Sequence, residues 1–264
     1  MKNSRVKRRW AEGKPVLATV SHFHDPQSAE LIGRMGIDCL WIDLEHQALG
    51  INQFENMVRA AHVAGMDVMG RAAKGEFARM ARLLDAGANL VMYPRCETAE
   101  EARQVVRSAK YPPFGQRGIF PPSPATPYCL TPIDEYLRQA NEEVIVMVQV
   151  ESPNAAKQAR DMAEVDGIDM IFFGPGDFSL AAGVPLQLNA PVVRDAMKQT
   201  AVDAISAGKR FGAYVNDMDG AKFALDIGAT LISYGSDQNF VRSGLADLRE
   251  QFTPMGIAFG DIYT

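Results

Sequence analysis

The strongest constraint on the fold is a repeated alternation between short apolar runs and amphipathic helical segments. The runs are almost continuously apolar, which is typical of parallel strands that are covered on both faces. Several helical segments end in glycine just before the next run, as helix C-caps often do. Eight such runs occur along the chain, at residues 16–21, 39–44, 67–72, 89–94, 144–151, 170–174, 210–215 and 231–235.

This count of strand–helix units, in a chain of 264 residues, predicts an α/β fold: a (β/α)8 TIM barrel in which residues 1–264 form a single domain. A doubly wound sheet is the alternative, but it favours a glycine-rich fingerprint after the first strand, where this chain reads SHFHDPQ.

One connection between a predicted helix and the next predicted strand breaks the pattern. Residues 111–143, between the fourth helix and the fifth strand, hold six prolines between Pro112 and Pro127. We expect an irregular, proline-rich insertion there, of the kind that is usually functional or a lid.

Composition excludes several classes of protein. The formal net charge is −5 and no large basic field is present, which argues against a nucleic-acid partner. No apolar run approaches the roughly 18 residues that span a bilayer, so no membrane association is expected. The basic start MKNSRVKRRW lacks the apolar stretch of an export signal. Three widely spaced cysteines fit a reduced protein, and we expect a cytoplasmic one.

Polar residues gather where the predicted strands end, which in this fold is where the chemistry lies. Glu151 and Asp177 follow neighbouring strands and can share a divalent cation, because Mg²⁺ takes one or two protein carboxylates and completes its shell with water and substrate oxygens. Mn²⁺ or Co²⁺ suits the same oxygen ligands. The alternative is that both acids only cap the helices that follow them. The other polar residues at strand ends are Asp43, Glu45, His46, Arg71, Arg95, Gln149, Asn216, Ser236 and Asp237.

Three of these positions carry recognisable chemistry. The fork of Arg71 suits a carboxylate or an enolate oxygen, although an ion pair at the barrel rim is the alternative. His46 can act as a general base near neutral pH. In the turn GPGD (174–177), Gly176 and Asp177 begin a helix whose free N–H groups attract anions, although Gly-Pro-Gly also marks ordinary tight turns.

The remaining histidines and lysines narrow the chemistry further. His22 and His24 follow the first strand with an open role, and His62 lies within a helical segment and is expected to be structural. No lysine lies inside the eight runs, and Lys74 is the nearest candidate. Schiff-base aldolases of this fold require such a lysine, so carbon–carbon chemistry here would use a metal as the electron sink.

Six stretches, spread over roughly residues 13–250, resemble the HpcH/HpaI family of class II pyruvate aldolases, which includes 2-keto-3-deoxy sugar-acid aldolases. The two most specific are VQVES (148–152) and VDGIDMIFFGPGDFS (165–179), in that order along the chain. The others are WIDLEHQ (41–47), GRAA (70–73), RLLDAGAN (82–89) and YPRCETAEEARQVVRSAKYPPFGQRG (93–118).

The resemblance implies an aldehyde-lyase that cleaves or forms 4-hydroxy-2-oxo acids, giving pyruvate and an aldehyde through a pyruvate enolate stabilised by a divalent metal. It implies that Glu151 and Asp177 hold the metal and that Gln149, Gly176 and Asp177 bind pyruvate. His46 would move the proton of the aldol hydroxyl and Arg71 would stabilise the enolate. Asp85 matches a residue that raises the basicity of the histidine, although its place at the end of a helix directs it away from the active face.

Departures from the family pattern concern the aldehyde half of the site. Leu44 precedes the Glu-His pair, Gln47 and Ala48 follow it, and the segment 119–132 is rich in proline and aromatic residues. Our hypothesis is that Phe120, Pro121 and Tyr128 shape an apolar pocket for the aldehyde. The turn GPGD replaces a GPAD-type turn and should keep its backbone binding.

Three other activities stay open from the residues alone: an oxaloacetate decarboxylase, a citryl or malyl thioester lyase, and a barrel that binds a carboxylate without turnover. The resemblance also implies a homo-oligomer, a hexamer built as a trimer of dimers with exchanged C-terminal helices. The tail FTPMGIAFGDIYT fits this, because Phe252, Ile257, Phe259 and Tyr263 need cover. Folding back onto the barrel is the other way to provide it.

Overall fold

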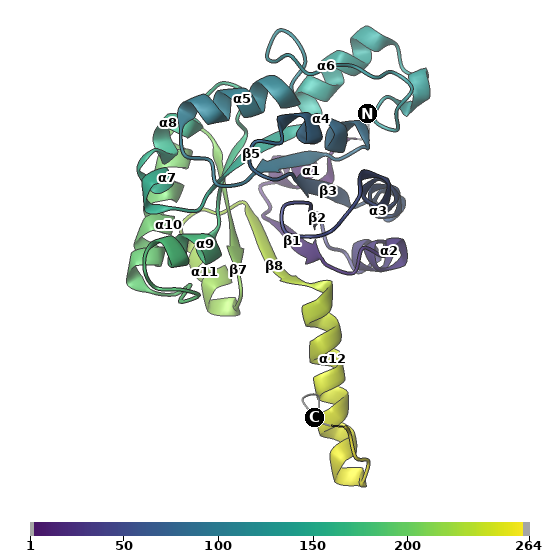
Figure 1. Ribbon diagram of the computed structural model, residues 1–264, viewed down its shortest axis with the longest axis vertical. Helices are drawn as coiled ribbons and strands as arrows, with labels where there is room; N and C mark the ends of the chain where they lie inside the picture. The colour runs from purple at the N-terminus through teal and green to yellow at the C-terminus, as the bar shows by residue number, and fades with distance from the viewer. Residues whose placement is uncertain (1–2, 261–264) are drawn as a thin grey trace.

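The strands form a closed parallel barrel in chain order, which confirms the predicted fold (Figure 1). The computed structural model describes residues 3–260. Each strand pairs with the next, and β8 closes the barrel against β1. Every predicted strand agrees with an observed one to within one residue at each end. The strands are β1 (Val16–Ser21), β2 (Cys39–Asp43), β3 (Asp67–Arg71), β4 (Leu90–Tyr93), β5 (Ile145–Val150), β6 (Met170–Phe173), β7 (Arg210–Val215) and β8 (Leu231–Ser236).

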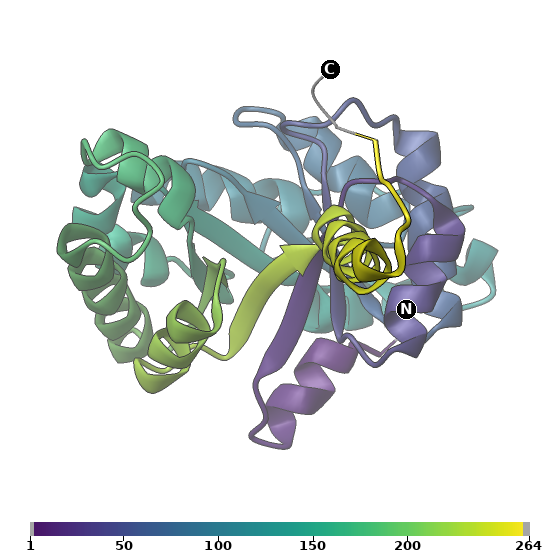
Figure 2. The same cartoon turned by 90° about the horizontal axis from the view of Figure 1, so that it is seen from below.

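Helices connect the strands and surround the barrel (Figures 1 and 2). Their starts follow the capping rules: Asp25, Thr98, Ser152 and Asp217 each accept a hydrogen bond from a backbone N–H of the first turn that follows. The helices are α1 (Arg5–Ala11), α2 (Pro26–Arg34), α3 (Ile51–Val63), α4 (Phe77–Asp85), α5 (Ala99–Ala109), α6 (Ile133–Glu143), α7 (Pro153–Lys157), α8 (Ala159–Ala163), α9 (Pro175–Ala181), α10 (Pro191–Ser206), α11 (Met218–Asp226) and α12 (Asp237–Phe252).

Helix α1 closes the end of the barrel opposite the carboxyl ends of the strands. Its Val6 and Trp10 are buried in the same apolar cluster as interior strand residues such as Met69 and Met147. The Ser4 hydroxyl and the Val6 N–H both donate to the buried carboxylate of Asp67 at the start of β3. One end of the barrel is therefore sealed, and its other end is left for ligands.

The connection predicted to be irregular over residues 111–143 ends in a helix, so that prediction was wrong for its last third. Helix α6 begins after Pro132 and carries Asp134 and Glu135 in its first turn, where acids are favourable. Tyr136 and Ala140 pack against Tyr111 and Ala125 in a small separate core. The irregular part is thus confined to residues 111–132, with a short 3-10 turn at Pro127–Cys129.

The C-terminal helix α12 leaves the barrel instead of folding back onto it (Figure 1). It begins at the carboxyl end of β8 and extends into solvent, with only its first residue, Asp237, buried. Folding back onto the barrel is therefore not how the apolar tail is covered. Phe252 and Ile257 are exposed, Phe259 lies beneath the Arg249 guanidinium, and Tyr263 falls outside the described residues. Within residues 3–260, no helix has both the length and the apolar character to cross a bilayer.

Candidate active site

The predicted polar residues converge on a cavity of about 670 Å³ at the carboxyl ends of the strands. It is lined by strand residues such as Val20, Trp41 and Tyr214 and by residues of the segments that follow the strands. Six of the seven site residues predicted from the sequence or the resemblance line this cavity: His46, Arg71, Gln149, Glu151, Gly176 and Asp177. His22 and His24 line it as well, whereas Asp85 does not.

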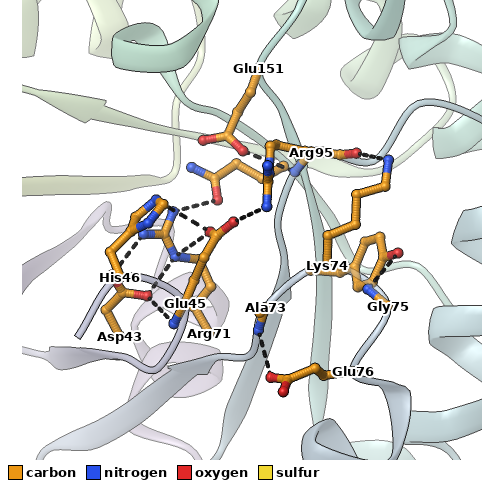
Figure 3. Close-up of polar contacts among 12 residues, drawn as sticks. Asp43, Glu45, His46, Arg71, Ala73, Lys74, Gly75, Glu76, Arg95 and Glu151 are labelled. Atoms are coloured by element: carbon orange, nitrogen blue, oxygen red, sulfur yellow. Dashed lines mark hydrogen bonds and ion pairs between the residues drawn. The ribbon is translucent and has the colours of Figure 1, made fainter. Parts of the chain in front are cut away.

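Arg71 is held rigidly at the base of this cavity (Figure 3). Its Nε and Nη2 atoms donate to the two carboxylate oxygens of Asp43, each at 2.8 Å, and the guanidinium lies 4.8 Å from the centre of the Trp41 ring. Burial disfavours the charged forms, but the ion pair outweighs it: the pKa of Arg71 is raised and that of Asp43 is lowered. The third nitrogen, Nη1, donates to Gln149 Oε1 at 3.3 Å. Arg71 is therefore charged and points toward Gln149.

Glu45 contacts three basic side chains beside the cavity. Its side chain is 3% exposed, and its carboxylate lies 3.3 Å from Arg71 Nε, 2.7 Å from Arg95 Nη2 and 3.7 Å from His46 Nε2 (Figure 3). The sequence placed Glu45 at a strand end without a role. Nothing in its local pattern reveals that it contacts two arginines, one at the end of β3 and one just after β4, because those contacts arise only when the barrel closes.

His46 differs from its buried neighbours because its side chain is 59% exposed. It lies on the wall between the main cavity and a second one of about 490 Å³, which Lys74, Arg95 and Ser152 also line. Glu151 and Asp177 border both cavities as well. A histidine at this place can reach a substrate from solvent and exchange its proton with water.

Glu151 is a buried carboxylate in an environment that disfavours its charge. Burial raises its pKa to about 7, with Asp177 and Glu45 acting in the same direction, and the Arg71 charge and a hydrogen bond from the Arg95 N–H oppose this. That N–H lies 2.9 Å from Oε2. The other oxygen, Oε1, lies against Gly174, where a Cβ atom would be only 2.5 Å away.

Asp177 comes from the start of α9, whose first residues are Pro175 and Gly176. The N-cap of this helix is Gly174, which has no side chain to cap it, and the Asp177 side chain is exposed at the cavity. The backbone N–H groups of this first turn have no partner within the helix, so they can bind an anion. A Cβ atom built at Gly176 would have no other atom within 4 Å, so a ligand has room to approach the backbone there.

This donor set fits one hard divalent cation. Two carboxylates, Glu151 and Asp177, line the same cavity, and burial, only partly offset by the Arg71 charge, raises the pKa of Glu151 to about 7. Over residues 3–260, no group of three or more His, Cys, Asp or Glu side chains is arranged to hold a metal. Two protein carboxylates suffice for Mg²⁺, which keeps water or substrate oxygens in its remaining positions.

Asp85 and the aromatic residues of the proline-rich segment lie elsewhere. Asp85 pairs with Arg117 at 2.6 Å, and Phe120 and Tyr128 lie with it around a separate cavity between α3, α4 and residues 120–128. Within one chain, Asp85 is therefore not a partner of His46. The hypothesis that Phe120, Pro121 and Tyr128 shape a pocket for the aldehyde finds no support in the main cavity, because none of the three lines it.

Comparison with known proteins gives a consistent result. The family model described as HpcH/HpaI aldolase/citrate lyase matches residues 21–243. A hydroxypyruvate/pyruvate aldolase from Delftia acidovorans is 32% identical over 237 residues, covering 89% of this chain and 87% of its own. A 2-keto-3-deoxy-L-rhamnonate aldolase from Salmonella paratyphi B is 35% identical over 209 residues, covering 79% and 78% of the two chains.

A solved structure agrees with these relatives. The crystal structure of an HpcH/HpaI aldolase from Desulfitobacterium hafniense superposes with a TM-score of 0.84 at 28% identity, covering 92% of this chain and 96% of that one. The resemblance noted from the six sequence stretches is thereby confirmed over most of the chain.

Proposed function

The chain belongs to the HpcH/HpaI aldolase/citrate lyase family, and from this premise we propose that it is a metal-dependent pyruvate aldolase. Its reaction would be the reversible cleavage of a 4-hydroxy-2-oxo acid to pyruvate and an aldehyde. The observation that carries the proposal is the shared cavity, which two carboxylates, an arginine held by Asp43 and the start of a helix all line. The names of the relatives from Delftia and Salmonella support the same reaction class.

In this proposal, Glu151 and Asp177 hold a divalent cation, Mg²⁺, Mn²⁺ or Co²⁺. When bound, such an ion supplies Lewis-acid polarisation of a keto oxygen. Its binding also requires the carboxylate form of Glu151, so binding releases a proton wherever that group is protonated. The bound ion would then add a second positive charge near Glu151, beside that of Arg71.

The pyruvate half of the substrate would lie between Arg71 and the start of α9. Gln149 and the backbone N–H groups of Gly176 and Asp177 would bind its carboxylate and keto oxygens. Arg71 is fixed by Asp43 and Trp41, so its charge is already directed at the cavity before the reaction begins. A preorganised donor of this kind stabilises the oxyanion that develops as the enolate forms.

His46 would accept the proton of the C4 hydroxyl while the C3–C4 bond breaks, and would return it in the reverse direction. Its exposure allows exchange with water, and its position on the wall between two cavities leaves space for the departing aldehyde. The Glu45 carboxylate lies 3.7 Å from Nε2, so it would pair with the imidazole whenever that ring is protonated.

We further propose a homo-oligomer, a hexamer built as a trimer of dimers, in which α12 packs against another chain. Exposed apolar side chains along that helix support it, among them Val241, Leu245 and Leu248. A cytoplasmic location is the matching proposal, because the three cysteines are unpaired, as is usual for proteins in a reducing compartment.

The test is a panel of 4-hydroxy-2-oxo acids assayed for pyruvate release. The purified protein is treated with EDTA, and Mg²⁺, Mn²⁺ or Co²⁺ is then added back. We expect release from at least one acid, loss of release with EDTA, and recovery with a divalent ion. Release that EDTA leaves unchanged would contradict the metal, and the absence of release from every acid would contradict the aldolase.

A further inference from the structure

Asp237 is a buried acid that the reaction outlined above does not use. It is the first residue of α12, and it is 4% exposed. Its carboxylate accepts hydrogen bonds from three donors at the end of β1: the Ser21 hydroxyl at 3.0 Å, the His22 N–H at 2.8 Å and the Phe23 N–H at 3.1 Å. A carboxylate that accepts hydrogen bonds from three such donors fixes the conformation of residues 21–23.

Capping of α12 does not explain this arrangement. Ser236 already serves as the N-cap, because its hydroxyl accepts from the Asn239 N–H. Asp237 bonds within its own helix only to the N–H of Gln238, and its other contacts reach across more than two hundred residues to β1. Most of the hydrogen bonds of Asp237 are therefore made with residues at the end of β1 and in the loop that follows, and not with its own helix.

The loop that Asp237 holds continues to His24, which contacts the segment that carries the proposed base. His24, at its far end, has a φ of 51°, in the left-handed region that non-glycine residues rarely adopt. Such a backbone persists only where its surroundings determine it. The His24 Nε2 atom contacts Oε1 of Gln47, the residue directly after His46. Both His24 and Gln47 line the main cavity, so this contact joins its two adjacent loops.

We propose that Asp237 is a positioning residue for His46. It fixes residues 21–23, these fix the strained His24, and the contact of His24 with Gln47 fixes the segment that carries His46. The inference rests on the proposed function because it takes His46 as the base. It adds that Asp237, the first residue of the exposed helix α12, helps to fix the position of His46.

The test uses Asp237→Asn, which keeps the size of the side chain. It replaces one of the two carboxylate oxygens, which accept hydrogen bonds, with an NH₂ group, which cannot accept them. Asp247→Asn, on the exposed part of the same helix, is the matched control. We expect Asp237→Asn to lower kcat for pyruvate release about 10- to 100-fold, the scale of a small misplacement of a reacting group. The KM should change less than about twofold, because the proposed pyruvate contacts remain.

A second variant, Gln47→Met, breaks the contact at the other end of the path. If both changes act through His24, the double variant Asp237→Asn/Gln47→Met should lose no more kcat than the worse single variant. Losses that multiply, or a kcat of Asp237→Asn within about twofold of the wild type, would overturn the proposal. The kcat of Asp247→Asn should equal that of the wild type. The kcat of the double variant Asp247→Asn/Gln47→Met should equal that of Gln47→Met.

Hydrogen–deuterium exchange keeps the two proposals separable. Asp237→Asn should speed exchange in the peptide over residues 44–50, none of which hydrogen-bonds to Asp237, as well as in the peptide over 21–25. Unchanged exchange over 44–50 would overturn the positioning role whatever the substrate is. A wild type that releases no pyruvate would overturn the proposed function, and the exchange result would still decide whether Asp237 acts on the His46 segment.

Discussion

Arg71 shows how strongly single residues of this site are constrained. It has no freedom to move toward a substrate, because Asp43 binds it twice, Glu45 once and Trp41 covers its face. Sequence reasoning found Arg71 from its place at a strand end. It did not assign a role to Asp43 or Trp41, since their function is to hold another side chain and such a role appears only in three dimensions.

Replacing this arginine tests its role directly. Arg71→Ala should lower turnover about 10²–10³-fold, the effect of removing one preorganised oxyanion donor. Steady-state pyruvate release measures it, with Arg103→Ala as the control, because Arg103 belongs to an exposed pair with Glu100 that contributes little. The variant also leaves Asp43 and Glu45 buried without their partner, so thermal unfolding must show that it is folded under the assay conditions. Turnover within a few-fold of the wild type would exclude Arg71 from oxyanion stabilisation.

The pKa of Glu151 predicts how cation binding depends on pH. Burial raises this pKa to about 7, so below that pH the free protein carries a proton where the cation would bind. The apparent affinity should therefore fall about tenfold for each pH unit below 7 and be nearly constant above it. Titration calorimetry with Mn²⁺ on chelator-treated protein, at pH 6 and pH 8, measures it. Equal affinity at the two pH values would contradict the assignment of Glu151 as a ligand.

At the scale of elements, the approach of β5 to the start of α9 decides the geometry of the site. A Cβ at Gly174 would lie 2.5 Å from Glu151 Oε1 and 2.6 Å from Gln149 Nε2, so a glycine is needed where the two elements meet. The sequence predicted the strands well, because buried parallel strands have a strong apolar signature. It did not predict α1 or α6, since their cores with Asp67 and Tyr111 depend on residues far along the chain.

Gly174→Ala should displace both Glu151 and Gln149 and weaken cation binding and turnover together, each by about 10-fold or more, as expected when a ligand's support is disturbed. Calorimetry and pyruvate release are the two measurements. Gly244→Ala is the control, because a Cβ at that exposed helical position meets nothing within 4 Å. Normal cation affinity in Gly174→Ala would show that this close contact does not set the position of Glu151.

For the whole molecule, the projecting helix α12 is the feature that a single chain does not explain (Figure 1). Val241, Leu245, Leu248 and Phe252 recur at three- and four-residue steps, so they form one apolar stripe, and all four are exposed. The sequence indicated that this end of the chain needs cover. It did not indicate the direction of the helix, which is set by the root at Asp237.

Charging this stripe should weaken the oligomer. Leu245→Asp places a carboxylate in the middle of the stripe, and burying it against another chain would be costly. Sedimentation velocity should show a shift toward smaller species. Ser243→Asp, which adds the same charge on the opposite side of the helix, should leave the assembly of the wild type. A wild type that sediments as a monomer would contradict the oligomer.

The proposed reaction depends most on Glu151 and Asp177 holding one divalent cation together. The most direct test is a calorimetric Mn²⁺ titration of chelator-treated protein at pH 8, comparing the wild type with Asp177→Asn and with the exposed control Asp161→Asn. We expect one ion per chain for the wild type and the control, and an affinity at least about 100-fold weaker for Asp177→Asn, since loss of a ligand exceeds loss of a ligand's support. Equal affinity in all three proteins would contradict it.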